Sequence, residues 1–361
     1  MNISDISEKS KKHIDSCRFC WMCRHICPIG NATGLERNTA RARALSLSMV
    51  YRGAEKLEDM ADNLFECALC GACVKECVTG WDPVSFTVEA KTQASLSGAL
   101  PAYILKLVEN FQKYGNVYGA ALPEASEFSG ERTDTLLYFG ETTRYKNTGA
   151  VRDVSGLLRA AGVSFTSLRE EEPSGYSLFY LTGKTAETRA QMQKCADLLN
   201  KYRKVVVYDP ADLKLMLREY REWGVELTAQ IVSFHTFLKE LLESGALKVK
   251  RSERIYTPQD NYNYSRELED VTTLREILGA VGTVREMLLS GRDTMFAGSL
   301  LMNEYMPDVM RKVAMDRWEN MRGMGLDCIV TESSDEQVLL RETAPAGCRV
   351  LSAEQAVLEN R

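Results

Sequence analysis

The sequence lacks several features that mark common classes of protein. Only three of its 361 residues are histidines, so nucleophile–base pairs have few candidates. Lys and Arg number 45 against 50 Asp and Glu, and the resulting net charge of −5 argues against nucleic acid as a main partner. No apolar run approaches the roughly 18 residues that cross a bilayer. The polar start has no secretory signal, so we expect a cytoplasmic protein without a transmembrane segment.

A glycine-rich nucleotide loop is missing as well. No Gly-x-Gly-x-x-Gly follows a predicted strand, so a NAD or FAD site of the usual type is not expected in this chain. The remaining composition, 45% hydrophobic and 26% charged, is that of an ordinary globular protein. The length suggests two or three domains.

Cysteine is unevenly distributed along the chain. Eight of the 11 cysteines lie between Cys17 and Cys77, whereas Cys195, Cys328 and Cys348 are scattered beyond them. A disulfide scaffold would be small and rich in cysteine throughout. Clustered cysteines in a cytosolic chain indicate a metal site instead. We expect the three isolated cysteines to be buried structural thiols.

The eight clustered cysteines form two copies of one pattern. The first copy reads Cys17-Arg-Phe-Cys20-Trp-Met-Cys23-Arg-His-Ile-Cys27-Pro28, and the second reads Cys67-Ala-Leu-Cys70-Gly-Ala-Cys73-Val-Lys-Glu-Cys77. Both have the C-x2-C-x2-C-x3-C spacing of bacterial 4Fe–4S ferredoxins. Three closely spaced thiolates curl around one cluster, while the fourth points away and binds the other cluster. Proline follows the fourth cysteine only in the first copy, because Val78 takes its place in the second.

This spacing predicts two 4Fe–4S clusters with exchanged fourth ligands. One cluster is expected on Cys17, Cys20, Cys23 and Cys77, and the other on Cys67, Cys70, Cys73 and Cys27. Zinc is the alternative, but zinc sites use C-x2-C pairs separated by a dozen or more residues. His25 is expected at the surface or behind the ligands. Phe19, Trp21 and Trp81 either shield the clusters from water or belong to the core.

The expected secondary structure changes character along the chain. Helix-forming residues at 38–51, capped by Asn38 or Thr39, and at 58–66 indicate an all-helical dicluster region. From residue 133 onward, β-rich runs alternate with helical patterns, which favours parallel α/β sheets. The expected strands are 135–139, 177–182, 204–208, 254–257, 293–297 and 327–331, and the expected helices are 151–161, 185–202, 211–223, 236–244, 272–289 and 300–324.

The chain resembles the iron–sulfur subunits related to heterodisulfide reductase, glycolate oxidase and anaerobic glycerol-3-phosphate dehydrogenase. The resemblance rests on residues 17–28, 67–77 and 114–119 and is looser elsewhere. It implies an α+β multidomain fold, with an N-terminal all-helical dicluster ferredoxin domain followed by two duplicated α/β domains of the cysteine-cysteine-glycine (CCG) type. The implied boundaries are 1–100 for the dicluster domain, 101–130 for a connector, and 131–250 and 251–361 for the two repeats.

The CCG cysteines of that family are absent here. In the implied register, Gly140-Glu141, 173–175 and 209–212 fill their places in the first repeat, and Gln259, 296–298 and 332–335 fill them in the second. The step of 34 residues from Gly175 to Asp209 equals the step from Gly298 to Glu332, which favours an internal duplication. Carboxylates do not bind iron–sulfur clusters as thiolates do. Glu141, Asp209, Asp212, Glu332 and Asp335 are candidates for a hard cation, but roles in loops and helix caps are favoured.

Three functions follow from these observations. The first is an electron-transfer subunit that passes single electrons between an FAD-containing dehydrogenase of the 2-hydroxy-acid or polyol type and a quinone, ferredoxin or flavoprotein. Such a complex could be held at the inner face of the membrane by a partner. The second is a self-contained reductase with a substrate site between the α/β repeats, and the third is a zinc-stapled interaction module. His235, on an apolar stretch, is expected to be a core or cap residue and not a base.

Overall fold

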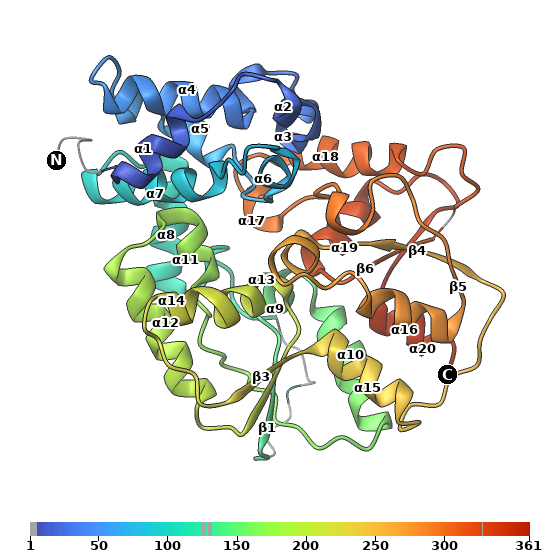
Figure 1. Ribbon diagram of the computed structural model, residues 1–361. Coiled ribbons are helices and arrows are strands. Elements are labelled where there is room, and N and C mark those ends of the chain that lie inside the picture. The colour runs from blue at the N-terminus through green and yellow to red at the C-terminus, as the bar shows by residue number, and fades with distance from the viewer. Residues whose placement is uncertain (1–5, 124–127, 129–131, 327) are drawn as a thin grey trace. The chain divides into compact units, whose positions relative to one another are not determined.

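The computed structural model describes residues 6–123, 128, 132–326 and 328–361. An N-terminal helical region precedes a region of helices and parallel strands (Figure 1). The chain divides into two compact units. The first comprises Met1–Gly119, Ser177–Arg189 and Leu301–Val313, and the second comprises Ala120–Tyr176, Ala190–Leu300 and Ala314–Arg361.

The N-terminal region is helical, as its sequence indicates. Thr39 caps α4, since its hydroxyl accepts a hydrogen bond from the backbone N–H of Ala42, and α5 carries buried apolar residues on one face. The helices are α1 (Glu8–Asp15), α2 (Met22–Ile26), α3 (Pro28–Thr33), η2 (Glu36–Asn38), α4 (Ala40–Tyr51), α5 (Leu57–Phe65), α6 (Ala72–Glu76), α7 (Pro83–Ser97) and α8 (Ala102–Tyr114).

The later part of the chain carries two sheets whose paired strands are all parallel. One has the order β1-β2-β3, and the other has the order β5-β4-β6-β7. The strands are β1 (Thr135–Tyr138), β2 (Lys204–Val207), β3 (Gln230–Ser233), β4 (Ile255–Gln259), β5 (Thr283–Val284), β6 (Cys328–Thr331) and β7 (Arg349–Ser352). The expected mixed α+β fold is therefore confirmed.

Helices connect these strands. In the first half they are α9 (Glu141–Lys146), α10 (Thr148–Ala160), α11 (Tyr176–Thr182), α12 (Ala186–Leu199), α13 (Pro210–Lys214), the π-helical η3 (Leu215–Glu219), α14 (Tyr220–Glu222) and α15 (Phe234–Glu243). In the second half they are the π-helical η4 (Asn263–Glu267), α16 (Thr273–Val281), η5 (Gly291–Asp293), α17 (Leu300–Asn303), α18 (Pro307–Glu319), α19 (Ser334–Glu342) and α20 (Ala353–Leu358).

The two halves repeat one order of elements. Gly175 and Gly298 both have positive φ, and each is followed by a short helix (α11 or α17) and then by a longer one (α12 or α18). Each longer helix leads to an interior strand of its sheet. In the first half this is β2, between β1 and β3, and in the second half it is β6, between β4 and β7. Gly175 and Gly298, from which the two equal steps of 34 residues were counted, thus precede the same order of elements in the two halves.

One hydrophobic core joins both halves of the second unit. It contains Leu137 and Val206 from the first sheet, Cys328 and Val330 from the second, and apolar residues of helices such as α10, α15, α16 and α20. Tyr208, which directly follows β2, donates a hydrogen bond to Glu354 of α20 at 2.9 Å. The repeats are therefore packed into a single unit and not into two independent cores.

Two expected strands are wrong. Residues 177–182 form most of α11, because a short apolar run buried on all sides satisfies a helix as well as a strand. Of residues 293–297, the first ends η5 and the others form no strand. Two expected helices are too long, since α16 ends before Gly282 and Pro307 begins a separate helix, α18. Strands β3, β5 and β7 were not predicted.

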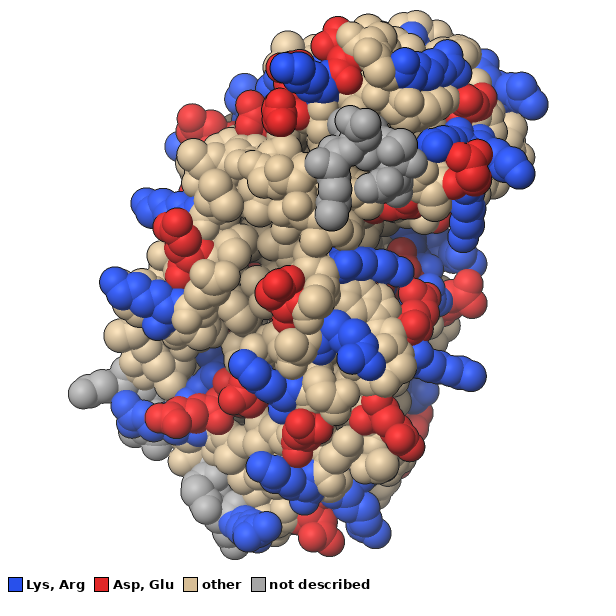
Figure 2. All heavy atoms as spheres, turned by 90° about the vertical axis from the view of Figure 1, so that its left-hand side faces the viewer, with Lys and Arg blue, Asp and Glu red and all other residues tan. Residues whose placement is uncertain are grey.

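Neither sign of charge dominates the face of the molecule drawn in Figure 2. In Figure 2 the basic and acidic side chains are interspersed over one face of the molecule. This pattern agrees with the nearly balanced composition of 45 basic and 50 acidic residues.

Candidate iron–sulfur centres

The two cysteine runs have the same backbone conformation. The residues before and after the second cysteine of each run are left-handed, with φ of 55° at Phe19, 70° at Trp21, 52° at Leu69 and 69° at Gly71. Three of these four residues are not glycine, and a left-handed conformation is unfavourable for them. The repeated turn wraps each run around a common centre instead of continuing as a helix.

Each turn leads into a five-residue helix that ends at the fourth cysteine. Helix α2 follows Trp21 and ends before Cys27, and α6 follows Gly71 and ends before Cys77. Both closing cysteines are extended, with φ and ψ of −73° and 112° at Cys27 and −80° and 113° at Cys77. The fourth cysteine therefore leaves each run in the same direction relative to its first three.

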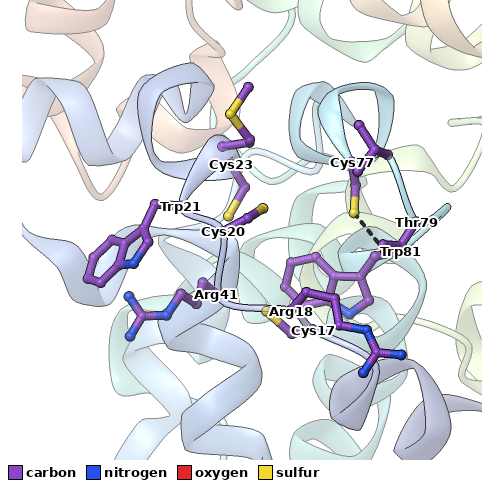
Figure 3. A pocket seen from close by; sticks show the side chains of 11 residues that line it. Cys17, Arg18, Cys20, Trp21, Cys23, Arg41, Cys77, Thr79 and Trp81 are labelled. Carbon is purple, nitrogen blue, oxygen red and sulfur yellow. Dashed lines mark hydrogen bonds between the residues drawn. The ribbon is translucent and has the colours of Figure 1, made fainter.

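The first three cysteines of the first run share a pocket with the last cysteine of the second. The cavity measures about 170 Å³, and its lining includes Cys17, Cys20, Cys23 and Cys77. Figure 3 shows these four side chains around the pocket, with Trp81 against it. Four thiols from two separate motifs thus face one cavity.

The complementary set lies together as well. The pKa of Cys73 is raised by burial, and the charges of Cys70, Cys67 and Cys27 act in the same direction. Burial also raises the pKa of Cys27 to about 12, while the Gly30 N–H and Arg43 oppose the rise. The last cysteine of the first run is therefore an electrostatic neighbour of the first three cysteines of the second run.

This chemistry fits an iron–sulfur cluster. A buried thiolate is costly by itself, and bound iron supplies the positive charge that compensates it. Backbone N–H groups also point at sulfur, from Gly30 to Cys27 and from Leu69 to Cys67, each at 3.4 Å. Such hydrogen bonds stabilise the negative charge of sulfur bound to iron.

Cys77 is the more exposed of the two fourth cysteines and has a different partner. Its sulfur lies 3.2 Å from the hydroxyl of Thr79 (Figure 3). Partial burial acts to raise the pKa of Cys77, but hydrogen bonds from Thr79 and from the backbone of Trp81 outweigh it and lower the pKa. In the first run, Pro28 begins α3 at the same position, and Cys27 caps that helix.

Two buried cations lie near the second run. Arg43 of α4 donates to the backbone oxygens of Asn63 (3.0 Å) and Asn38 (3.3 Å). Lys91 of α7 donates to the carbonyl of Tyr180 at 3.1 Å, and its ammonium lies 3.8 Å from the centre of the Tyr180 ring. Burial lowers the pKa of Lys91 to about 7, whereas the charge of Cys67 acts to raise it. Both cations favour negative charge in their surroundings.

Two tyrosines from distant parts of the chain bind the backbone of the second run. The hydroxyl of Tyr180, in α11, donates to the carbonyl of Cys67 at 2.8 Å. The hydroxyl of Tyr305, just after α17, donates to the carbonyl of Phe65 at 2.8 Å, and the two hydroxyls are 3.2 Å apart. Segments from both α/β halves thus help to hold the second run.

Sequence reasoning missed these four residues. Tyr180 lay in a segment expected to be a strand, and Tyr305 lay inside a helix expected to be continuous. Arg43 and Lys91 had no visible signal beyond being charged residues within otherwise apolar helical patterns. Such residues are normally assigned to a solvated face, but here both are buried.

The aromatic residues and His25 divide between surface and interior. Trp81 is buried, and its indole N–H donates to the carbonyl of His13 at 2.6 Å. Trp21 and Phe19 are exposed, and both rings face the guanidinium of Arg41, which lies 3.7 Å from the Trp21 ring centre. His25 is exposed, as one of the expected alternatives had it. Trp21 and Trp81 both line the first pocket.

The five carboxylates singled out in the sequence, which are Glu141, Asp209, Asp212, Glu332 and Asp335, are mostly buried. Asp209 caps α13 by accepting from the N–H groups of Ala211 and Asp212. Burial raises the pKa of Asp212 and, to about 8, that of Asp335. Within the described part of the chain, no three His, Cys, Asp or Glu side chains are grouped so that they could hold a single metal ion.

The isolated cysteines and His235 are largely interior. Cys195 and Cys328 are buried, as expected, but Cys348 is only half-buried, so the prediction is wrong for this residue. His235 is buried in α15, where its Nδ1 lies 3.1 Å from the hydroxyl of Tyr264, and burial lowers its pKa to about 3. His235 is therefore a core residue, in agreement with the expectation.

Comparison with known proteins agrees with the geometry. Residues 13–81 match the family described as "4Fe-4S dicluster domain". This region is a ferredoxin-like iron–sulfur domain of the electron-transfer type. The match covers the helices that carry both cysteine runs and ends at Trp81.

Two relatives extend beyond this domain. A protein of Chromohalobacter salexigens named "Probable membrane-anchored ferredoxin" is 28% identical over 265 residues, which are 67% of this chain and 39% of that protein. An "Uncharacterized iron-sulfur protein" of Methanocaldococcus jannaschii is 22% identical over 335 residues, which are 90% of this chain and 66% of that protein. The chain thus spans about two fifths and about two thirds of these relatives.

In the described residues, no helix is both long enough and apolar enough to cross a bilayer.

Proposed function

We propose that this chain is the iron–sulfur electron-transfer subunit of an oxidoreductase complex, with two 4Fe–4S clusters as its cofactors. The first cluster is held by Cys17, Cys20, Cys23 and Cys77, and the second by Cys67, Cys70, Cys73 and Cys27. Bound clusters supply one-electron chemistry. The chain provides the thiolates, shields them from water to different degrees and sets the charge around them.

One observation carries this assignment. The last cysteine of each run lies with the first three cysteines of the other: Cys77 lines the pocket of the first run, and Cys27 interacts electrostatically with Cys67 and Cys70. This exchange is the arrangement expected of a two-cluster ferredoxin motif. It brings two one-electron centres into one small helical domain, as electron transfer between them requires.

The crossed ligand sets can be tested by pairs of substitutions. If Cys17 and Cys77 bind the same cluster, Cys17→Ser, Cys77→Ser and the double variant should each lose about four irons per chain. Cys17→Ser combined with Cys27→Ser should lose about eight, because it damages both clusters. Iron and sulfide analysis of anaerobically purified protein gives the counts. The reverse pattern would show that each run binds its own cluster with all four cysteines.

A flavoprotein partner follows from the electron count. Dehydrogenation of an organic substrate releases two electrons, and each cluster accepts one, so a flavin must divide the pair. We propose an FAD-containing dehydrogenase of the 2-hydroxy-acid or polyol type as donor, and quinone, ferredoxin or another flavoprotein as acceptor. The resemblance to the iron–sulfur subunits of glycolate oxidase and anaerobic glycerol-3-phosphate dehydrogenase supports this choice.

The domain plan and location complete the proposal. We propose a dicluster domain at 1–100, a connector at 101–130 and degenerate CCG-like repeats at 131–250 and 251–361. The complex works in the cytoplasm, held by a partner at the inner face of the membrane. The name of the Chromohalobacter relative, which includes a membrane anchor, supports such an association for that class of protein.

Co-purification tests the partner. A tagged chain isolated anaerobically from its own host should bring down a yellow, FAD-containing protein in stoichiometric amount. Adding that protein's substrate should bleach the iron–sulfur absorption of the complex, but not that of the isolated chain. Oxidation of that substrate by the isolated chain with an artificial electron acceptor, or reduction of its oxidised product with an artificial electron donor, would contradict the proposal and favour a self-contained reductase.

A further inference from the structure

The surface over the first cysteine run is unusually open. The five consecutive residues from Arg18 to Met22 are all exposed, and Val78, beside the fourth cysteine of the same pocket, is 90% exposed. The equivalent residues of the second run, 68–72, are mostly buried. The first run is therefore the one that another molecule can approach.

An exposed tryptophan at this surface is held in an unfavourable conformation. Trp21 has a φ of 70° where the second run has glycine, and a left-handed conformation costs a non-glycine residue roughly 1–2 kcal/mol. The ring is 39% exposed, so burial of Trp21 within this chain does not fully explain its presence. Arg41 lies against the ring (Figure 3) and forms an ion pair with Glu36 at 2.7 Å. Arg41 thus fixes the position of the indole, while part of Trp21 stays exposed to solvent.

The same surface carries an excess of positive charge. Arg18 and Arg24 are exposed and, among the described residues, neither has a carboxylate within ion-pair distance. No Asp or Glu occurs from residue 16 to residue 35, although the chain contains 50 of them. Some exposed arginines elsewhere are paired, for example Arg52 with Asp15 and Arg322 with Glu319.

We propose that Arg18, Phe19, Trp21, Met22, Arg24 and Val78 form a docking surface for a protein electron carrier whose surface around its own redox centre is acidic. Trp, Met and Arg with an apolar centre are typical of protein interfaces, and unpaired charges at the rim steer a partner of opposite charge. The inference rests on the proposed function, because it places the exchange of electrons with the partner at the first cluster.

The test measures electron transfer from the reduced, cluster-loaded full chain. Stopped-flow oxidation by an acidic flavodoxin should be fast at low salt and should slow at least tenfold as the salt concentration rises to 0.5 M, because salt screens the steering charges. Arg18→Glu/Arg24→Glu should lower the low-salt rate by about tenfold or more and reverse the sign of the salt dependence. Arg221→Glu/Arg322→Glu changes the net charge equally at exposed positions elsewhere and should leave the rate within about twofold of wild type.

Small charged oxidants test whether the charge of Arg18 and Arg24 acts at the first cluster. The anion ferricyanide should react more slowly with Arg18→Glu/Arg24→Glu than with wild type, and the cation hexaamminecobalt(III) should react faster. Unchanged iron content and EPR spectra show that the variant is correctly folded. Equal rates for the two charge-reversed double variants would overturn the docking surface and leave the proposed function intact.

Two other outcomes would also overturn the inference. Flotation of the wild-type chain with vesicles of anionic phospholipid, lost in Arg18→Glu/Arg24→Glu while the flavodoxin rate stays unchanged, would assign this surface to a membrane. A chain that contains no reducible cluster would defeat the proposed function, and this inference with it.

Discussion

The two cysteine runs have the same spacing and the same backbone turns but opposite surroundings. The first run lies at the surface, with Cys20 exposed and two arginines, Arg18 and Arg41, lining its pocket. The second run lies beside the buried residues Leu64 and Phe65 and near two buried cations. A local motif therefore determines which atoms can bind iron, while its surroundings determine how stable and how accessible the bound cluster is.

We propose that this difference gives the two proposed cluster sites different roles. An exposed centre exchanges electrons readily with other molecules, whereas a buried centre among cations holds an added electron more stably. The second site is moreover bound to segments from the α/β halves through Tyr180 and Tyr305. The following predictions test the contrast, starting with the largest expected effect.

Equivalent cysteines should differ in their importance for stability. Cys20→Ser and Cys70→Ser change the same position of the motif, and each should reduce the iron content by about half. Cys70→Ser should also lower Tm far more, because it leaves an uncompensated cavity inside the domain. Iron analysis and thermal unfolding followed by circular dichroism, both without oxygen, make the comparison. Equal values of Tm for the two variants would contradict the contrast.

The α/β repeats should show a pH dependence that arises from a buried carboxyl. Glu354 accepts a hydrogen bond from Tyr208, its second oxygen is buried without a partner among the described residues, and burial raises its pKa to about 7. A raised folded-state pKa means that stability is complete below the unfolded pKa of about 4.3 and is lost as the pH rises through about 7. The loss should be about 4 kcal/mol at most.

Glu354→Gln tests this assignment. The substitution keeps an acceptor for Tyr208 but removes the charge, so it should stabilise the protein at pH 8 and flatten the fall between pH 5 and pH 8. The free energy of unfolding from urea titrations at several pH values is the measurement. Glu342→Gln, at an exposed position of α19, is the matched control and should keep the wild-type slope. A Glu354→Gln variant with the same slope as wild type would rule out this carboxyl as the source.

Lys91→Met should shift the reduction potential of one cluster only. Below a pH of about 7, where Lys91 is protonated, loss of its buried positive charge disfavours the added electron, so the potential of the second cluster should become more negative while iron content stays complete. EPR-monitored redox titration resolves the two clusters. Lys113→Met, a fully exposed lysine of α8, should move neither potential. A shift of both clusters by equal amounts would show that the two sites do not differ in this respect.

The left-handed positions should give the smallest effect. Gly71→Ala places a Cβ at a φ of 69° and should lower the free energy of unfolding by about 1 kcal/mol, or Tm by a few degrees. Trp21→Gly removes a comparable strain from the first run and should leave Tm equal to or above that of wild type. A marked loss of stability in Trp21→Gly would show that the exposed indole is held for packing and not for contact with a partner.

Much of the fold and of the candidate site could be predicted from local patterns. The expected helix that begins after Thr39 and the strands near 135, 204, 255 and 328 are present, because capping residues and β-branched runs act over a few residues. The run at 177–182 was misassigned because an apolar segment buried on all sides has no period that separates strand from helix. Strands β3 and β7, which are as long as β1 and β2, were missed; both lie at the edge of a sheet, where only part of the strand is covered.

The sequence by itself determined which thiols are available for clusters, their order in two equivalent runs, and the scarcity of cysteine beyond Cys77. The tertiary structure alone decided which run is buried and which cations and hydroxyls surround it. Tyr180 and Cys67 are 113 residues apart in the chain, and Tyr305 and Phe65 are 240 apart. Contacts over such separations depend on how whole elements pack, and no local pattern of residues encodes them.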